Sequence, residues 1–156
     1  MGWMRRRPRG APPEWTGAAD VRPRVLLEHR DPSVLDILSD GLEDEGFEVL
    51  TCGGPRPEVG PGTACPLLSG EACPGVDGAD VVVTSLLVED GEQGRIVVAL
   101  TNLPEGPPVL LEATSLQAGR RFAPGEAPAL RYPFTDAASL AADIRGLLRE
   151  HATLPG

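Results

Sequence analysis

Residues 24–52 read RVLLEHRDPSVLDILSDGLEDEGFEVLTC, and this stretch decides the fold. Its first part, Arg24–Glu28, has the apolar run of a buried strand. Asp31 then stands where it caps a helix, with a proline at the first helical position, where no backbone N–H is needed. Apolar residues recur at helical spacing up to Gly46, and Phe47–Thr51 alternates as a second strand. The stretch therefore predicts a strand–helix–strand unit.

The same alternation of strands and helices continues along the chain. It predicts three more strands, Ala79–Val88, Pro108–Glu112 and Ala129–Arg131, and two more helices, Arg95–Thr101 and a last one that Thr135 caps. Residues 52–78 are too rich in proline and glycine for a regular helix. Because strands that alternate with helices form parallel sheets from right-handed βαβ units, we expect an α/β domain. Its five-stranded parallel sheet should be doubly wound, in the flavodoxin-like order 2-1-3-4-5.

Length and charge narrow the classes of function. The chain has 156 residues and a net charge of −9. That length suits one domain, and the negative charge argues against nucleic acid or an anionic membrane as the main partner. No apolar run reaches the roughly 18–20 residues that span a bilayer, and no signal-peptide core follows the basic N-terminus. We therefore expect a cytoplasmic protein with a disordered, Pro/Gly/Arg-rich leader over residues 1–21 and a domain over residues 22–151.

Taken in order, these segments resemble a known family. RVLLEHRDPSVLDILSDGLEDEGFEVLTC is similar to the first strand, first helix and second strand of the receiver domains of bacterial two-component response regulators. ADVVVTSLL resembles their third strand, PPVLLEAT the fourth, and RYPFTDAASLAADIRGLLRE the fifth strand and last helix. The resemblance covers roughly residues 22–150 and implies the CheY-like form of the flavodoxin-like fold.

The residues that the family uses for phosphotransfer are missing from this sequence. The family needs two acids for Mg²⁺ after the first strand, an acceptor Asp after the third, a Thr or Ser after the fourth and a Lys before the proline of the fifth. The corresponding residues here are His29, Arg30, Ser85, Ala113 and Tyr132, and the chain contains no lysine at all. Arginine repels a cation that prefers carboxylate oxygens, and serine is a weak nucleophile without a neighbouring base. The resemblance therefore implies a degenerate receiver, or pseudo-receiver, that is not an enzyme and signals without phosphorylation.

Two interpretations of the former metal position remain open. His29 and Arg30 either pack or pair with nearby acids, or Arg30 helps to hold an anion or a partner's carboxylate. A shifted alignment places acids at Asp31 and Asp90, but Asp90 lies well beyond the end of its strand.

All three cysteines lie in the irregular stretch 52–78. The spacing of Cys52, Cys65 and Cys73 matches no common zinc motif, but His29 supplies a fourth ligand if the first two strands are adjacent. A zinc site would anchor this loop, and a reversible disulfide would make it redox-sensitive. Ordinary packing of small semi-buried residues is the third interpretation. A metal (Zn) or thiol-redox sensor on a receiver scaffold is thus the alternative function, whereas the main interpretation needs no cofactor.

The expected partner is another protein. Only His151–Gly156 follow the last predicted helix, so output should come through binding. In receivers the face of the fourth and fifth strands commonly makes such contacts, and here it carries Arg120, Arg121 and Tyr132. A homodimer through that face is one possibility. An enzyme is disfavoured because no phosphate-cradling glycine loop lies at a strand end, the GG at 53–54 being followed by proline.

Overall fold

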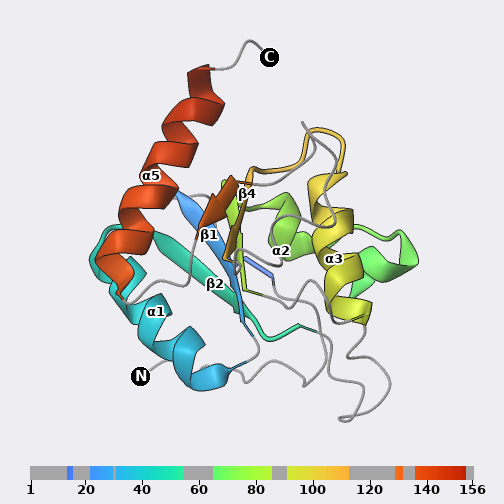
Figure 1. Ribbon diagram of the computed structural model, residues 1–156, viewed down its shortest axis with the longest axis horizontal. Helices are drawn as coiled ribbons and strands as arrows, with labels where there is room; N and C mark the ends of the chain where they lie inside the picture. The colour runs from blue at the N-terminus through green and yellow to red at the C-terminus, as the bar shows by residue number, and fades with distance from the viewer. Residues whose placement is uncertain are drawn as a thin grey trace.

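A five-stranded parallel sheet runs through the middle of the molecule (Figure 1). The computed structural model describes residues 14–15, 22–29, 31–54, 65–85, 91–112, 129–131 and 136–153. The strands are β1 (Arg24–Glu28), β2 (Glu48–Cys52), β3 (Val81–Thr84), β4 (Val109–Glu112) and β5 (Ala129–Arg131). They pair in the order β2-β1-β3-β4-β5, with every pair parallel. The predicted doubly wound order is therefore confirmed.

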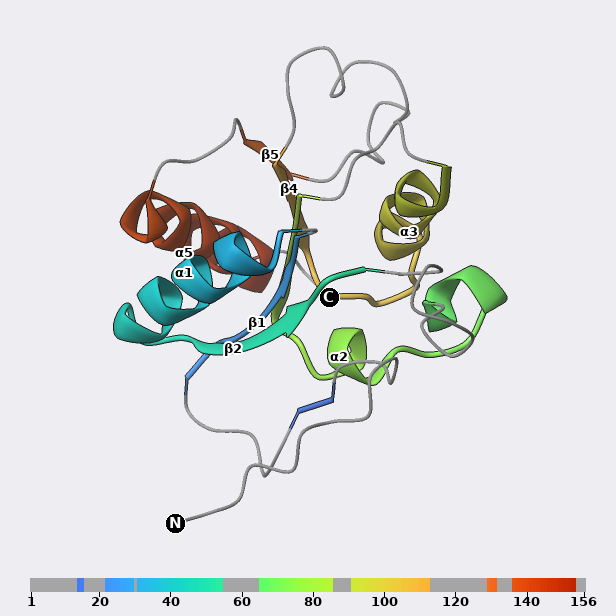
Figure 2. The ribbon, with the colours of Figure 1, turned by 90° about the horizontal axis from the view of Figure 1, so that it is seen from below.

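Helices cover both faces of this sheet (Figure 2). α1 (Pro32–Asp44) and α5 (Ala137–Thr153) lie on one face, and α2 (Pro74–Asp77) and α3 (Gly91–Thr101) lie on the other. The 3₁₀ helix η2 (Pro66–Ser69) packs beside α3 in the second layer. The sheet is thus covered on both sides, as parallel sheets require.

The pleat of the strands divides the interior into two cores. Val25 and Leu27 of β1 pack among side chains of α1 and α5, in what we call the α1/α5 core. Leu26, between them, packs with side chains of α2 and α3 in the α2/α3 core. Successive residues of a strand point to opposite faces, so the face of every later position on β1 is fixed by this alternation.

α1 and α5 pack closely. The Asp31 carboxylate caps α1 by accepting a hydrogen bond from the Ser33 N–H at 2.9 Å, as the sequence predicted. A Cβ placed on Gly41 would overlap Ala137 Cβ, so the glycine permits this close approach. Beside it, Arg145 Nη1 lies 3.2 Å from Glu45 Oε2. The glycine therefore sets how near the two helices come.

Some element boundaries differ from the predicted ones. β2 begins at Glu48 because the Phe47 N–H donates to the Leu42 carbonyl of α1, at 3.1 Å. α3 begins at Gly91, four residues earlier than expected. The Asp136 carboxylate accepts from the Ser139 N–H at 2.7 Å at the start of α5, whereas Thr135, the predicted cap, lies outside the described residues.

The predicted strand Ala79–Val88 is shorter in the structure, where β3 ends at Thr84. Residues 86–90 lie outside the described part of the chain. The prediction that residues 52–78 form no regular helix is confirmed where they are described, because only the four-residue η2 and α2 are present. Each of these begins with a proline.

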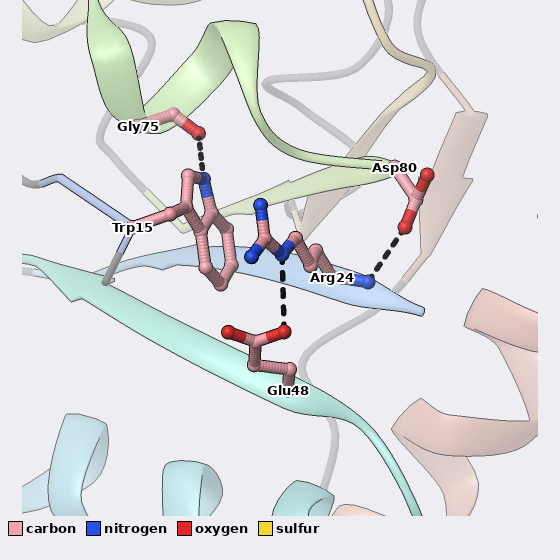
Figure 3. Close-up of polar contacts among 5 residues, drawn as sticks. All are labelled: Trp15, Arg24, Glu48, Gly75 and Asp80. Carbon is pink, nitrogen blue, oxygen red and sulfur yellow. Dashed lines mark hydrogen bonds and ion pairs between the residues drawn. The ribbon is translucent and has the colours of Figure 1, made fainter. Parts of the chain in front are cut away.

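The leader contacts the domain at Trp15, which the sequence did not predict. The indole packs against the α2/α3 core and donates a hydrogen bond from Nε1 to the Gly75 carbonyl at 2.8 Å (Figure 3). Glu14 and Trp15 are the only residues before Arg22 that the structure describes. No helix in the described ranges has the length and apolar character needed to cross a bilayer.

Candidate functional site

The carboxyl edge of the sheet carries two of the predicted site residues. The His29 N–H donates to the Cys52 carbonyl at 3.1 Å, and the Ser85 N–H donates to the Glu28 carbonyl at 3.0 Å. Both residues therefore extend the hydrogen-bonding pattern of the sheet by one position beyond β1 and β3. These strands are neighbours, so the structure brings His29 and Ser85 to adjacent strand ends, where open α/β sheets bind their ligands.

His29 is held toward the start of α1. Its Nδ1 accepts a hydrogen bond from the Asp31 N–H at 2.9 Å, so this nitrogen carries no proton. Partial burial lowers the pKa of His29, against the opposing effect of the Asp31 carboxylate. The imidazole is therefore neutral at pH 7, and the acid that follows it caps a helix instead of facing a cation.

Ser85 occupies the acceptor position with an isolated hydroxyl group. Its Oγ is buried and has no hydrogen-bond partner. A serine nucleophile requires a base within hydrogen-bond reach, and none contacts this oxygen. Ser85 Oγ therefore has no hydrogen-bonded base beside it in this structure.

The other predicted positions of this edge are not described. Arg30, Ala113 and Tyr132 lie outside the described residues, as does Asp90, the second acid of the shifted alignment. The partner-binding residues Arg120 and Arg121 also lie outside them. The predictions for these residues, including the anion site at Arg30 and the homodimer face, therefore stay predictions.

A buried carboxyl group that the sequence did not single out lies at the end of β1. Glu28 is 4% exposed, and burial raises its pKa from 4.5 to about 8. It is therefore protonated and uncharged at neutral pH. By the alternation of β1 it shares a face with Leu26, so it faces the α2/α3 core. A neutral acid on this face does not form an ion pair with His29.

Glu28 belongs to a row of polar side chains across three strands. In register it pairs with Cys52 on β2 and with Thr84 on β3. Glu28 and Thr84 are the buried polar or charged residues of the described chain, and Cys52 packs against the α2/α3 core. We call Cys52, Glu28 and Thr84 the polar row.

The two other cysteines pack on the same core as the polar row. Cys73 is 5% exposed and lies within the α2/α3 core, and Cys65 packs against it. Burial is the main cause that raises the pKa of Cys52 to about 12 and of Cys65 to about 11, with a further contribution from Glu28. Burial raises the pKa of Cys73 as well. All three are free thiols and stay protonated at neutral pH, which makes them unreactive.

The predicted zinc ligands are not assembled in this structure. Among the described residues, no group of three or more His, Cys, Asp or Glu side chains is arranged to hold a metal ion. The physical reason is that Cys52 packs on the α2/α3 side of the sheet, whereas the His29 ring bonds to the backbone at the start of α1, on the other side. Zinc also requires deprotonated thiols, and burial opposes deprotonation here.

Comparison with solved structures identifies the fold. The chemotaxis response regulator CheY4 of Vibrio cholerae superposes with a TM-score of 0.57 at 17% identity, over 81% of this chain and 99% of that one. This chain has a receiver fold. The BeF3-activated DrrB receiver domain is similar at 16% identity and a TM-score of 0.55, over 83% and 99% of the two chains.

A third similar structure is that of the histidine kinase ThkA in complex with the response regulator protein TrrA. It matches at 15% identity and a TM-score of 0.54, over 81% of this chain and 98% of that one. No family model and no curated protein matches the sequence. At these identities the comparisons show the receiver fold alone.

Proposed function

We propose that this domain is a phosphorylation-independent pseudo-receiver that acts in two-component-like signalling by binding another protein. The receiver fold supports the class, and Ser85 at the acceptor position carries the proposal. An aspartyl phosphate forms on a carboxylate, whereas the Ser85 Oγ is a buried hydroxyl with no partner. The domain keeps the receiver's shape without its acceptor.

The surroundings of Ser85 support the same proposal. Mg²⁺ binds carboxylate and water oxygens, and the residue directly after β1 is His29, a neutral histidine whose Nδ1 already accepts a hydrogen bond from the Asp31 N–H. The carboxylate of Asp31 is used by the N-terminus of α1. Glu28, the nearest buried acid, faces the other core and is uncharged at neutral pH. The chain has no lysine to contact a phosphoryl group.

The class of partner is inferred from the receiver fold and from the net charge of the chain. One similar structure contains a histidine kinase bound to a response regulator, so receiver-shaped surfaces do form protein complexes. The net charge of −9 disfavours nucleic acid. A protein partner, or a second copy bound through the β4–β5 face with Arg120, Arg121 and Tyr132, is therefore the proposed ligand.

A zinc or thiol-redox sensor is the second candidate. One observation favours it, since the three cysteines all pack on the α2/α3 core. Their burial and raised pKa values oppose it, because both metal binding and oxidation start from a thiolate.

Beryllofluoride, a phosphoryl mimic, tests the main proposal directly. The full chain is titrated with beryllofluoride and Mg²⁺ while ¹⁹F NMR monitors bound fluoride, with the DrrB receiver domain as positive control because its solved structure is BeF3-activated. We expect no bound signal for this chain. A bound fluoride signal that is lost in a Ser85→Ala variant would overturn the proposal.

A further inference from the structure

A slot for an indole ring lies at the amino edge of the sheet, opposite the edge that carries Ser85. Figure 3 shows Trp15 in this slot, between α2 and the first residues of β1 and β2. The indole Nε1 donates to the Gly75 carbonyl at 2.8 Å, and the Arg24 guanidinium carbon lies 5.0 Å from the ring centroid. A hydrogen bond at one edge of the ring and a cation over its face together select an aromatic side chain with an N–H group.

Arg24 is fixed in place by its own partners. Its Nε donates to Glu48 Oε2 at 3.0 Å, and its backbone N–H donates to Asp80 Oδ2 at 2.7 Å (Figure 3). The arginine side chain is only 11% exposed, and its Nη2 is buried without a hydrogen-bond partner. The guanidinium therefore lies against the indole in a largely water-free position, where a cation–π contact is strong.

Gly78 leaves space for the indole ring, whereas its backbone conformation does not require a glycine. A Cβ at this position would overlap Trp15 Cδ1 and lie 2.9 Å from Nε1. The backbone angles of Gly78, φ −92° and ψ −2°, are ones that any residue adopts. The absence of a side chain is thus required by Trp15 alone, and this makes the slot specific for a docked ring.

The helix that receives the indole is a single turn, which Val76 also packs onto the α2/α3 core. α2 is only four residues long, and its N-cap residue Cys73 makes no side-chain capping hydrogen bond. A single helical turn is unstable by itself, because nucleation is unfavourable. Trp15 contacts both Gly75 within the helix and Gly78 at its end. Cys73, directly before α2, is 5% exposed.

We propose that Trp15 is a latch from the chain's own N-terminal segment, which holds α2 on the sheet and thereby keeps the Cys73 and Cys65 thiols covered. Its release uncovers these two thiols, while Cys52 stays covered because it belongs to β2. The occupant is the same chain, because its own Trp15 makes the contacts with Gly75 and Arg24. The latch does not depend on what binds at the carboxyl edge.

Thiol labelling of the full chain tests the latch. The wild type, Trp15→Ala and the matched control Trp3→Ala are labelled with a maleimide, and peptide mass spectrometry gives a rate for each cysteine. Loss of the indole hydrogen bond and ring contact should raise the Cys73 and Cys65 rates about tenfold or more in Trp15→Ala, and leave Cys52 unchanged. Equal rates in Trp15→Ala and Trp3→Ala would overturn the latch, and so would an equal rise at all three cysteines, which indicates global unfolding.

A second variant, Gly78→Ala, changes the wall of the slot instead of the indole. Gly78→Ala adds a methyl group where the indole lies, so it should raise the Cys73 rate in the wild-type background and add nothing in the Trp15→Ala background. Additive effects in the double variant would contradict the proposal, because the two residues would then act independently.

Trp15 fluorescence shows whether the slot is filled, and whether the tryptophan in it comes from the same chain or from a second copy. In a Trp3→Phe chain Trp15 is the only tryptophan. We expect Trp15 to emit at shorter wavelength than in the urea-unfolded chain and to be weakly quenched by acrylamide. Its emission should not depend on protein concentration. Emission like that of the urea-unfolded chain would show an empty slot, and a blue shift that appears only at high concentration would show a second copy's Trp15 in it. Either result would overturn a latch within one chain.

Discussion

Glu28 should make this domain less stable as the pH rises through the neutral range. Its pKa is 4.5 in the unfolded chain and about 8 in the folded one, so between these values the folded state binds more protons. Linkage then requires the free energy of unfolding to fall with rising pH, by up to about 1.4 kcal/mol per pH unit. The contribution is fully present below pH 4.5 and is lost as the pH rises through about 8.

The Glu28→Gln variant isolates this effect, because the amide keeps the size of the side chain and does not titrate. Urea unfolding at pH 5.5 and pH 7.5 should show that the wild type loses about 1–3 kcal/mol more than the variant over this range. The lowered pKa of His29 makes the free energy of unfolding rise with pH. Because the wild type and Glu28→Gln both contain His29, this contribution cancels when the two are compared. Glu43→Gln, an exposed change on α1, is the control and should follow the wild type. Parallel curves for the wild type and Glu28→Gln would refute the reasoning.

Three further predictions concern packing, capping and metal. Gly41→Ala should lower the free energy of unfolding by about 1–3 kcal/mol, because its methyl group meets Ala137 where α1 approaches α5; no loss in urea unfolding would contradict this contact. Asp31→Ala should lower the free energy of unfolding by about 1 kcal/mol and Asp31→Asn by much less, since only the alanine removes the N-cap; equal decreases in thermal unfolding would argue against capping. Protein purified without chelator should contain well under one equivalent of zinc by elemental analysis, in both the wild type and Cys65→Ser, because no group of ligands among the described residues is arranged to hold a metal ion; one equivalent that is lost in Cys65→Ser would favour the sensor.

The fold was predictable because its signals are local. The cap at Asp31 and the apolar spacing of α1 lie within one stretch of sequence, and β1, β4 and β5 follow from short apolar runs. The start of α3 was missed because Gly91 and Gly94 have low helix propensity, and tertiary packing overrides it. The start of β2 was misplaced by one residue because the Phe47 N–H bonds back to α1.

The buried polar groups were not predictable in the same way. Glu28 ends an apolar strand and resembles an exposed strand end in sequence. It faces the α2/α3 core, and residues 65–77, which supply part of that core, have no periodicity that shows which face they cover. The contact between Trp15 and Gly75 joins residues sixty positions apart, and no local pattern indicates it. His29 and Ser85, by contrast, directly follow β1 and β3, so their place at the carboxyl edge follows from the strand order.

The proposed function requires that the carboxyl edge of this receiver fold takes up no phosphoryl group. Intact-protein mass spectrometry after incubation with acetyl phosphate and Mg²⁺ measures this most directly. We expect an unchanged mass for the full chain under conditions that phosphorylate an active receiver domain. A phosphoryl adduct that is labile to hydroxylamine, as an acyl phosphate is, would contradict it.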